Sequence, residues 1–115
     1  MTEHTEQSKL IKWASYQQKD NPALGCLFAI PNAGKRSITC SNYYLAEGLK
    51  AGVPDLFLAV MRGGYGGLFI EMKRPGILPS EKQKKWHEKL KRQGYFVVVC
   101  HGFEEAKGII ERYLK

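Results

Sequence analysis

Cysteine is scarce in this chain, and it has no long hydrophobic run. The three cysteines, Cys26, Cys40 and Cys100, are far apart, odd in number and form no CxxC pair. Such a set provides no disulfide framework, which favours a reducing compartment. No apolar run is long enough to span a membrane, and the polar N-terminus lacks the apolar segment of a signal peptide. We therefore expect a cytoplasmic protein without a membrane segment.

Acidic residues are fewer than basic residues in this chain. The chain has 11 Asp and Glu against 18 Lys and Arg, which gives a formal charge of +7. This excess favours a polyanionic partner, most commonly nucleic acid, although a basic domain can also bind nothing specific. The hydrophobic share of 43% and charged share of 25% are ordinary for a globular protein. At this length we expect a single domain over residues 1–115.

Two neighbouring segments are predicted to form a β-hairpin. Residues 56–60 and 68–73 have the composition of strands, and the glycine-rich run between them suits a turn. Side chains alternate along a strand, so Glu71 and Lys73 share a face while the apolar residues between and before them point into a core. Asp55 stands at the head of the first strand, where a hairpin brings its carboxylate beside Glu71.

Two acids and one amine at this place allow two interpretations. Mg²⁺ takes oxygen ligands, usually one or two carboxylates together with water and substrate phosphate. An ammonium nearby can orient the attacking water and stabilise developing negative charge. The group therefore suits metal-dependent phosphodiester hydrolysis. The alternative is a surface ion pair at a sheet edge. Glu71-x-Lys73 by itself favours this alternative, because short motifs often occur by chance. When Pro54-Asp55 is considered as well, the two interpretations are equally supported.

These motifs resemble a known nuclease family. Pro54-Asp55 followed by Glu71-Met72-Lys73 resembles the PD-(D/E)xK nuclease signature. The resemblance covers the chain from about residue 3 to 114, is specific in its middle third, and is closest to small, stand-alone, phage-encoded members of the VRR-NUC (virus-type replication and repair nuclease) branch. The segments that carry it are Gly52 to Leu56, Gly67 to Pro75, Gln83-x-x-Trp86, Gly94-Tyr95 and Val99-Cys100-His101-Gly102.

The resemblance implies a restriction-endonuclease-like core, a Mg²⁺ or Mn²⁺ cofactor, and cleavage of structured or branched DNA such as a Holliday junction. It also implies a homodimer, acting in the host cytoplasm if the protein is phage-encoded. The residues that it implies for the site are Asp55, Glu71 and the Met72 backbone carbonyl as metal ligands, Lys73 beside the attacking water, and a glutamate of the first helix, Glu3 or Glu6, as a further ligand.

A capping-box pattern, Ser80-Glu81-Lys82-Gln83, predicts a helix that runs to about Gln93. Gln83, Trp86 and Leu90 share a face of this helix, and we expect that face to be buried. Gln83 then has two open roles. It is either a capping residue, or a site residue that holds a water, Lys73 or a phosphate, and the family resemblance favours the second.

Basic residues around these segments are candidates for DNA phosphate contacts. A solvated helix face is the plainer interpretation of those on the helix, and the two are compatible. The candidates are Lys35, Arg36, Arg74, Lys82 and Lys85. Cys100 and His101 lack zinc-ligand spacing, so a structural role is expected for both.

The predicted fold is α/β, in the order α-β-α-β-β-α-β-α, with helices flanking a small mixed sheet. The alternative function is a non-catalytic basic nucleic-acid-binding module with this fold. The remaining predicted elements are helices over 3–18, 41–50 and 103–114, a strand over 26–30, and a strand over 95–100 buried on both faces.

Overall fold

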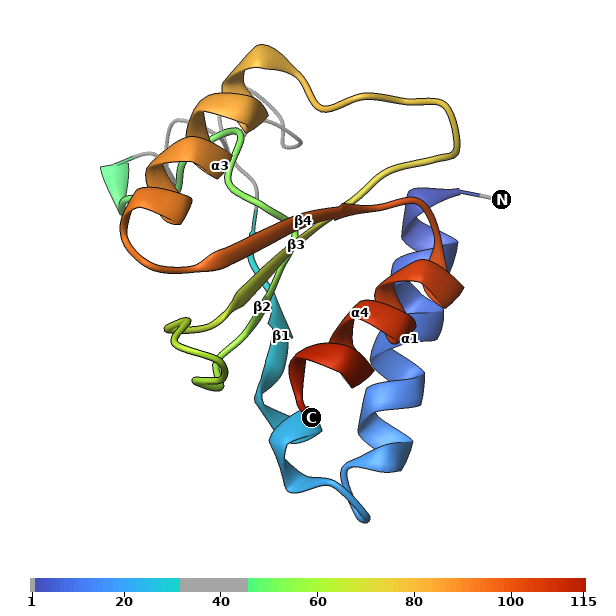
Figure 1. Ribbon diagram of the computed structural model, residues 1–115. Helices are drawn as coiled ribbons and strands as arrows, with labels where there is room; N and C mark the ends of the chain where they lie inside the picture. The colour runs from blue at the N-terminus through green and yellow to red at the C-terminus, as the bar shows by residue number, and fades with distance from the viewer. Residues whose placement is uncertain (1, 32–45) are drawn as a thin grey trace.

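A four-stranded sheet lies between two helices on one face and a third helix on the other (Figure 1). The computed structural model describes residues 2–31 and 46–115. The strands follow the order β1-β2-β3-β4, in which the first three are antiparallel and β4 is parallel to β3. The elements are α1 (Glu3–Gln17), the 3₁₀ helix η1 (Pro22–Cys26), β1 (Leu27–Ala29), β2 (Leu56–Leu58), β3 (Leu68–Met72), α3 (Glu81–Arg92), β4 (Phe96–Cys100) and α4 (Phe103–Tyr113).

The predicted α/β fold with a small mixed sheet is confirmed, and so is the hairpin. Its turn is tight, since Tyr65 N donates to Arg62 O at 2.8 Å and Arg62 N donates to Tyr65 O at 3.2 Å. Gly63 and Gly64 between them have φ values of +57° and +85°. Positive φ at both central positions is the pattern of the type I′ turn, whose twist matches that of the flanking strands.

One face of the sheet is wholly apolar. Leu68, Ile70 and Met72 of β3 are fully buried on this face, where they join a core with residues of α1 and α4. Figure 1 shows these two helices side by side against the sheet. The helix residues in the core are Leu10 and Ala14 of α1 and Ala106 and Ile110 of α4. Burial on this face is the main source of stability for so small a sheet.

The opposite face carries the aromatic cluster and α3. Phe69 of β3 stacks on Phe57 of β2, with ring centroids 4.3 Å apart, and Tyr95 meets both rings edge-on. Beyond Phe69 the next side chain on this face is Glu71, which lies under α3. The sheet therefore separates a dry core from a face where polar groups are gathered.

The expectation that the last strand is buried on both faces is wrong. Residues 96–99 are half-buried, and only Cys100 is fully covered. The reason is the strand order, which places β4 at the edge of the sheet instead of the centre. The valine-rich run signals an apolar strand, but it does not reveal how many neighbours the strand has.

Two predicted features fall on residues 32–45, outside the described residues. They are the basic pair Lys35-Arg36 and the first half, residues 41–45, of the helix expected over 41–50. No helix in the part of the chain that the structure describes is long and apolar enough to cross a membrane.

We expect Gly67→Ala to destabilise the protein by about 1–3 kcal/mol, the usual cost of overpacking. A Cβ at Gly67 would lie 2.5 Å from the ring of Phe57, which cannot move away because it is stacked on Phe69. The matched control is Gly108→Ala in α4, where a new Cβ meets only the end of Arg112 at 3.9 Å. There alanine should stabilise the helix by up to about 1 kcal/mol. Denaturant unfolding of both variants measures the difference, and equal effects would contradict the packing argument.

Candidate active site

The register of the hairpin places Asp55 beside Glu71. Leu56 pairs with Ile70 across the antiparallel β2–β3 ladder, so the residue before Leu56 lies opposite the residue after Ile70. The Asp55 carboxylate is fixed there, because its Oδ2 accepts a 2.7 Å hydrogen bond from Met72 N. Its own carbonyl accepts a 2.8 Å bond from Ile30 N, which extends the β1–β2 pairing. Asp55 is therefore held by the backbone of both neighbouring strands.

Glu71 is buried beneath α3, with 1% of its surface exposed. Two side chains of that helix contact its carboxylate, one on each oxygen. Gln83 Nε2 donates to Oε2 at 3.3 Å, and His87 Nε2 lies 3.3 Å from Oε1. A carboxyl group in such a place needs these partners, because an unpaired buried charge is very unfavourable.

Gln83 forms hydrogen bonds with its side-chain oxygen, its side-chain nitrogen and its backbone nitrogen. Its Oε1 accepts a 2.8 Å hydrogen bond from Ser80 N, and its backbone N donates to Ser80 Oγ at 3.2 Å, which completes the predicted capping box. The amide nitrogen remains for Glu71. The capping role and the position beside the site are thus not alternatives, since one residue fulfils both.

His87 is the residue that sequence reasoning missed, since no partner could be assigned to it. The predicted inner face of α3 is correct for Gln83, which is buried, and for Trp86 and Leu90, which are half-buried, but it omits His87, which is buried on the same face. A polar side chain is buried at position 87 because it contacts the Glu71 carboxylate beneath the helix. The i, i+4 spacing of Gln83 and His87 was the available signal, because it puts both on one face.

Burial raises the pKa of Glu71 to about 7, and the neighbouring Asp55 carboxyl adds to the rise. The hydrogen bond from His87 and the positive charge of Lys73 act in the opposite direction on this pKa. The effect of Lys73 on the pKa of Glu71 agrees with the alternation of side chains along the strand, which puts residues 71 and 73 on one face. Lys73 is half-buried, and its backbone N donates to Cys100 O at 2.9 Å.

The donor set suits a hard divalent cation. Two carboxylates lie together in a buried place, where their mutual repulsion favours binding of a proton to one of them. A divalent cation relieves the same repulsion, and oxygen ligands are those that Mg²⁺ and Mn²⁺ prefer. Among residues 2–31 and 46–115, no group of three or more His, Cys, Asp and Glu is placed to hold a metal ion. Backbone oxygens, water and substrate would have to complete the shell.

The first helix does not add a carboxylate to Asp55 and Glu71 in the described structure. Glu6 is engaged elsewhere, since its Oε1 accepts a 2.9 Å bond from Phe103 N at the start of α4 and its Oε2 pairs with Lys9 at 3.0 Å. The bond from Phe103 lowers the pKa of Glu6, and Lys9 lowers it further. Glu3 lies half-buried in the first turn of α1.

The remaining candidates are the basic residues predicted to contact DNA phosphates. Arg74, Lys82 and Lys85 are exposed, whereas Lys35 and Arg36 are outside the described residues. His101 has the expected structural contact, because its Nε2 lies 3.1 Å from Ile77 O in the segment between β3 and α3.

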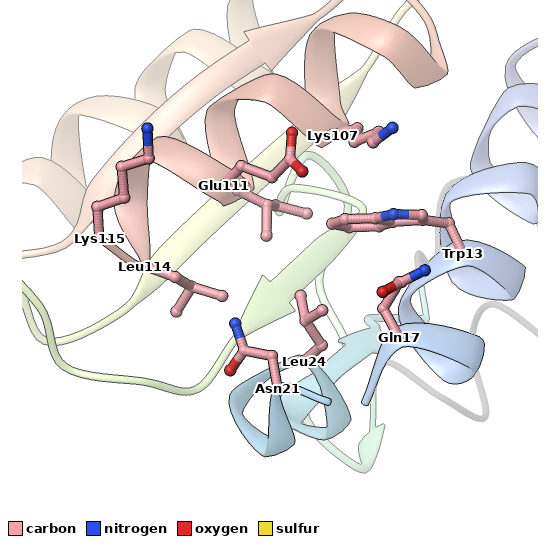
Figure 2. Close-up of a pocket in the computed structure, with 9 residues that line it drawn as sticks. Trp13, Gln17, Asn21, Leu24, Lys107, Glu111, Leu114 and Lys115 are labelled. Atoms are coloured by element: carbon pink, nitrogen blue, oxygen red, sulfur yellow. The ribbon is translucent and has the colours of Figure 1, made fainter. Parts of the chain in front are cut away.

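A separate hollow of about 350 Å³ lies between α1, η1 and α4 (Figure 2). Trp13, Gln17 and Glu111 line it, and neither Asp55 nor Glu71 does. Figure 2 shows the Trp13 ring at one side and the Glu111 carboxylate across from it. This hollow is therefore not part of the candidate active site.

Comparisons with known proteins agree on one family. The VRR-NUC domain family matches residues 2–104 of the chain. A solved structure described as a VRR_NUC domain protein is similar, with a TM-score of 0.84 and 30% sequence identity. The match covers 99% of this chain and 88% of that one. A search of curated proteins found no match.

We expect Glu71→Gln to stabilise the metal-free protein above pH 7 and to have a smaller effect at pH 5. The pKa of Glu71 is raised from 4.5 to about 7 in the folded state, so its contribution to stability is full below 4.5 and lost as the pH rises through 7. At 1.36 kcal/mol per pKa unit, the difference between wild type and variant should grow by on the order of 3 kcal/mol.

Denaturant unfolding in EDTA at pH 5 and pH 8 measures this growth. Glu88→Gln is the matched control, since Glu88 lies on the outer side of the same helix with 61% of its side chain exposed. A difference between wild type and Glu71→Gln that is the same at both pH values would contradict the raised pKa.

Proposed function

Because this chain belongs to the VRR-NUC family, a family of nucleases, we propose that it is a metal-dependent endonuclease that hydrolyses phosphodiester bonds in branched DNA. Four-way Holliday junctions are the substrate that we favour. The observation that carries the proposal is the buried pair of Asp55 and Glu71 with Lys73 on the same face. An apolar pair would be more stable on this face, so the burial of two acids calls for a chemical reason.

The proposed metal ligands are Asp55, Glu71 and the Met72 backbone carbonyl. Bound Mg²⁺ or Mn²⁺ would polarise the phosphate and lower the pKa of a bound water. Asp55 is well suited to this role, because its 2.7 Å bond from Met72 N fixes one oxygen. Glu71 is fixed by α3 in a similar way. Neither carboxylate has to be ordered when the substrate binds, which reduces the entropic cost of assembling the site.

Lys73 and Gln83 are proposed to act beside these ligands. The Lys73 ammonium would orient the attacking water and stabilise the negative charge that grows on the phosphate oxygens. Gln83 would hold Glu71 in place from the first turn of α3. The position of α3 over the strand ends thus matters for chemistry as well as for folding.

The DNA would approach along the basic residues beside the site. Arg74 follows Lys73 directly, and Lys82 and Lys85 lie exposed on α3. Contacts from such residues to phosphates position DNA without reading its sequence, as suits an enzyme that recognises structure. The proposal also assigns Lys35 and Arg36 to phosphate binding.

We place the whole activity in one domain over residues 1–115. An exposed free thiol at Cys26 and a buried one at Cys100 suit a reducing cytoplasm, including that of a host cell.

The decisive experiment is incubation of a labelled four-way junction with the protein, with and without Mg²⁺. We expect nicking only with the metal, and a loss of at least ~100-fold in Asp55→Asn, Glu71→Gln and Lys73→Met, because each removes stabilisation of the transition state. DNA affinity, measured by fluorescence anisotropy in Ca²⁺, should change little in the two acid variants.

The control variant for cleavage is again Glu88→Gln on the outer side of α3, which should cut as wild type. Near wild-type turnover in two of the three site variants would overturn the site assignment. Tight junction binding without any cutting by the wild type would favour the alternative, a non-catalytic nucleic-acid-binding module.

We also propose that the protein works as a homodimer. One site makes one nick, and a four-way junction is close to two-fold symmetric and needs two matched nicks to be resolved. A C₂ dimer supplies two sites related by that symmetry. Tyr65, with 40% of its surface exposed, is a candidate for the interface, because aromatic residues are enriched there. Tyr43 and Tyr44 are further candidates that lie outside the described residues.

Light scattering at micromolar concentration should give the mass of two chains. On a junction, the two nicks should fall at symmetric positions within the lifetime of one complex. Tyr65→Ser tests the interface, with Tyr16→Ser as the control because Tyr16 is exposed on α1. A monomer mass together with symmetric paired nicks would break the proposed link between assembly and function.

A further inference from the structure

His87 lies in the middle of α3 and points inward, with 6% of its surface exposed. Its Nε2 is 3.3 Å from Glu71 Oε1, while Gln83 occupies the other oxygen of the same carboxylate. The two residues are one helical turn apart, so they contact Glu71 from a single rigid face. The carboxylate is therefore held at both oxygens by one helix.

This inference rests on the proposed function, in which Glu71 is a metal ligand. An ionised carboxylate only accepts hydrogen bonds, so His87 must carry its proton on Nε2 when Glu71 binds a cation. The bond then orients the carboxylate plane and leaves its remaining lone pairs for the metal. We propose that His87 is a positioning residue, which holds the Glu71 carboxylate in the orientation that a divalent cation requires.

A space-filling role is the simpler explanation of a buried histidine. The geometry argues against it, because an aliphatic side chain would fill the same space without placing a polar nitrogen against a carboxylate. Leaving Oε1 without this partner would cost free energy, and the carboxylate would be less firmly oriented although Gln83 still contacts Oε2. Groups that orient metal ligands in this way commonly change metal affinity by 10- to 100-fold when they are removed.

The test compares three substitutions at one position. In glutamine the amide nitrogen is as many bonds from the backbone as Nε2 of histidine, so His87→Gln should keep the contact. In asparagine the nitrogen is one bond closer, so His87→Asn should lose it. His87→Met fills the space without a donor. Glu88→Gln, on the outer side of the same helix, is the control.

Mn²⁺ binding to the protein without DNA is the primary readout, measured by electron paramagnetic resonance or calorimetry. We expect the dissociation constant to rise roughly 10- to 100-fold in His87→Asn and His87→Met and to stay within about threefold of wild type in His87→Gln. In cleavage assays, the Mn²⁺ concentration for half-maximal rate should rise with it, while the rate at saturating Mn²⁺ changes less.

Thermal melting of each variant without metal separates this role from a general loss of folding. If one of the Asn and Met variants does not fold, the other still provides the comparison with glutamine. Unchanged affinity in all three, or an equal loss in all three, overturns the proposal.

Glu71→Gln distinguishes failure of this inference from failure of the proposed function. If wild type binds no Mn²⁺, or if Glu71→Gln binds it as wild type does, the assigned metal site is wrong. If Glu71→Gln loses Mn²⁺ while the His87 substitutions do not, only the role of His87 is refuted.

Discussion

The burial of the Glu71 carboxyl on the face of β3 is the interaction on which the other features of this face depend. Taking a carboxylate out of water is costly, and the cost grows when a second acid, Asp55, lies beside it. The structure offsets part of this cost with two side chains of α3, one on each oxygen. These polar contacts therefore help to fix the position of α3 over the sheet.

The capping box makes this arrangement possible. The helix begins at Glu81, and Gln83 caps its first turn while reaching Glu71. Any shift in the start of the helix would move both Gln83 and His87 off the carboxylate. A local folding signal and the geometry of the site therefore depend on one residue.

Two buried acids illustrate how environment decides the use of the same side chain. At Glu6, a backbone N–H and Lys9 lower the pKa, so the ionised carboxylate is stabilised. Its hydrogen bond from Phe103 N connects the start of α4 to α1. At Glu71, burial beside Asp55 raises the pKa, so the charge is unfavourable until a cation is present. Perturbation of the second kind is typical of functional sites, whereas the first is typical of structural ones.

The sequence by itself determined the local features: the hairpin with its glycine turn, the capping box before α3, the apolar side of β3 and the placement of Asp55 opposite Glu71. Each depends on residues close in the chain or on the period of a strand or helix, which composition and spacing reveal. The tertiary structure alone decided the edge position of β4, the use of Glu6 to anchor α4, and the contact of His87 with Glu71. These contacts join segments up to 97 residues apart, and spacing along the chain carries no information about which distant groups will meet. The roles proposed for the site residues go one step beyond both, because they concern the metal and DNA that these groups would bind.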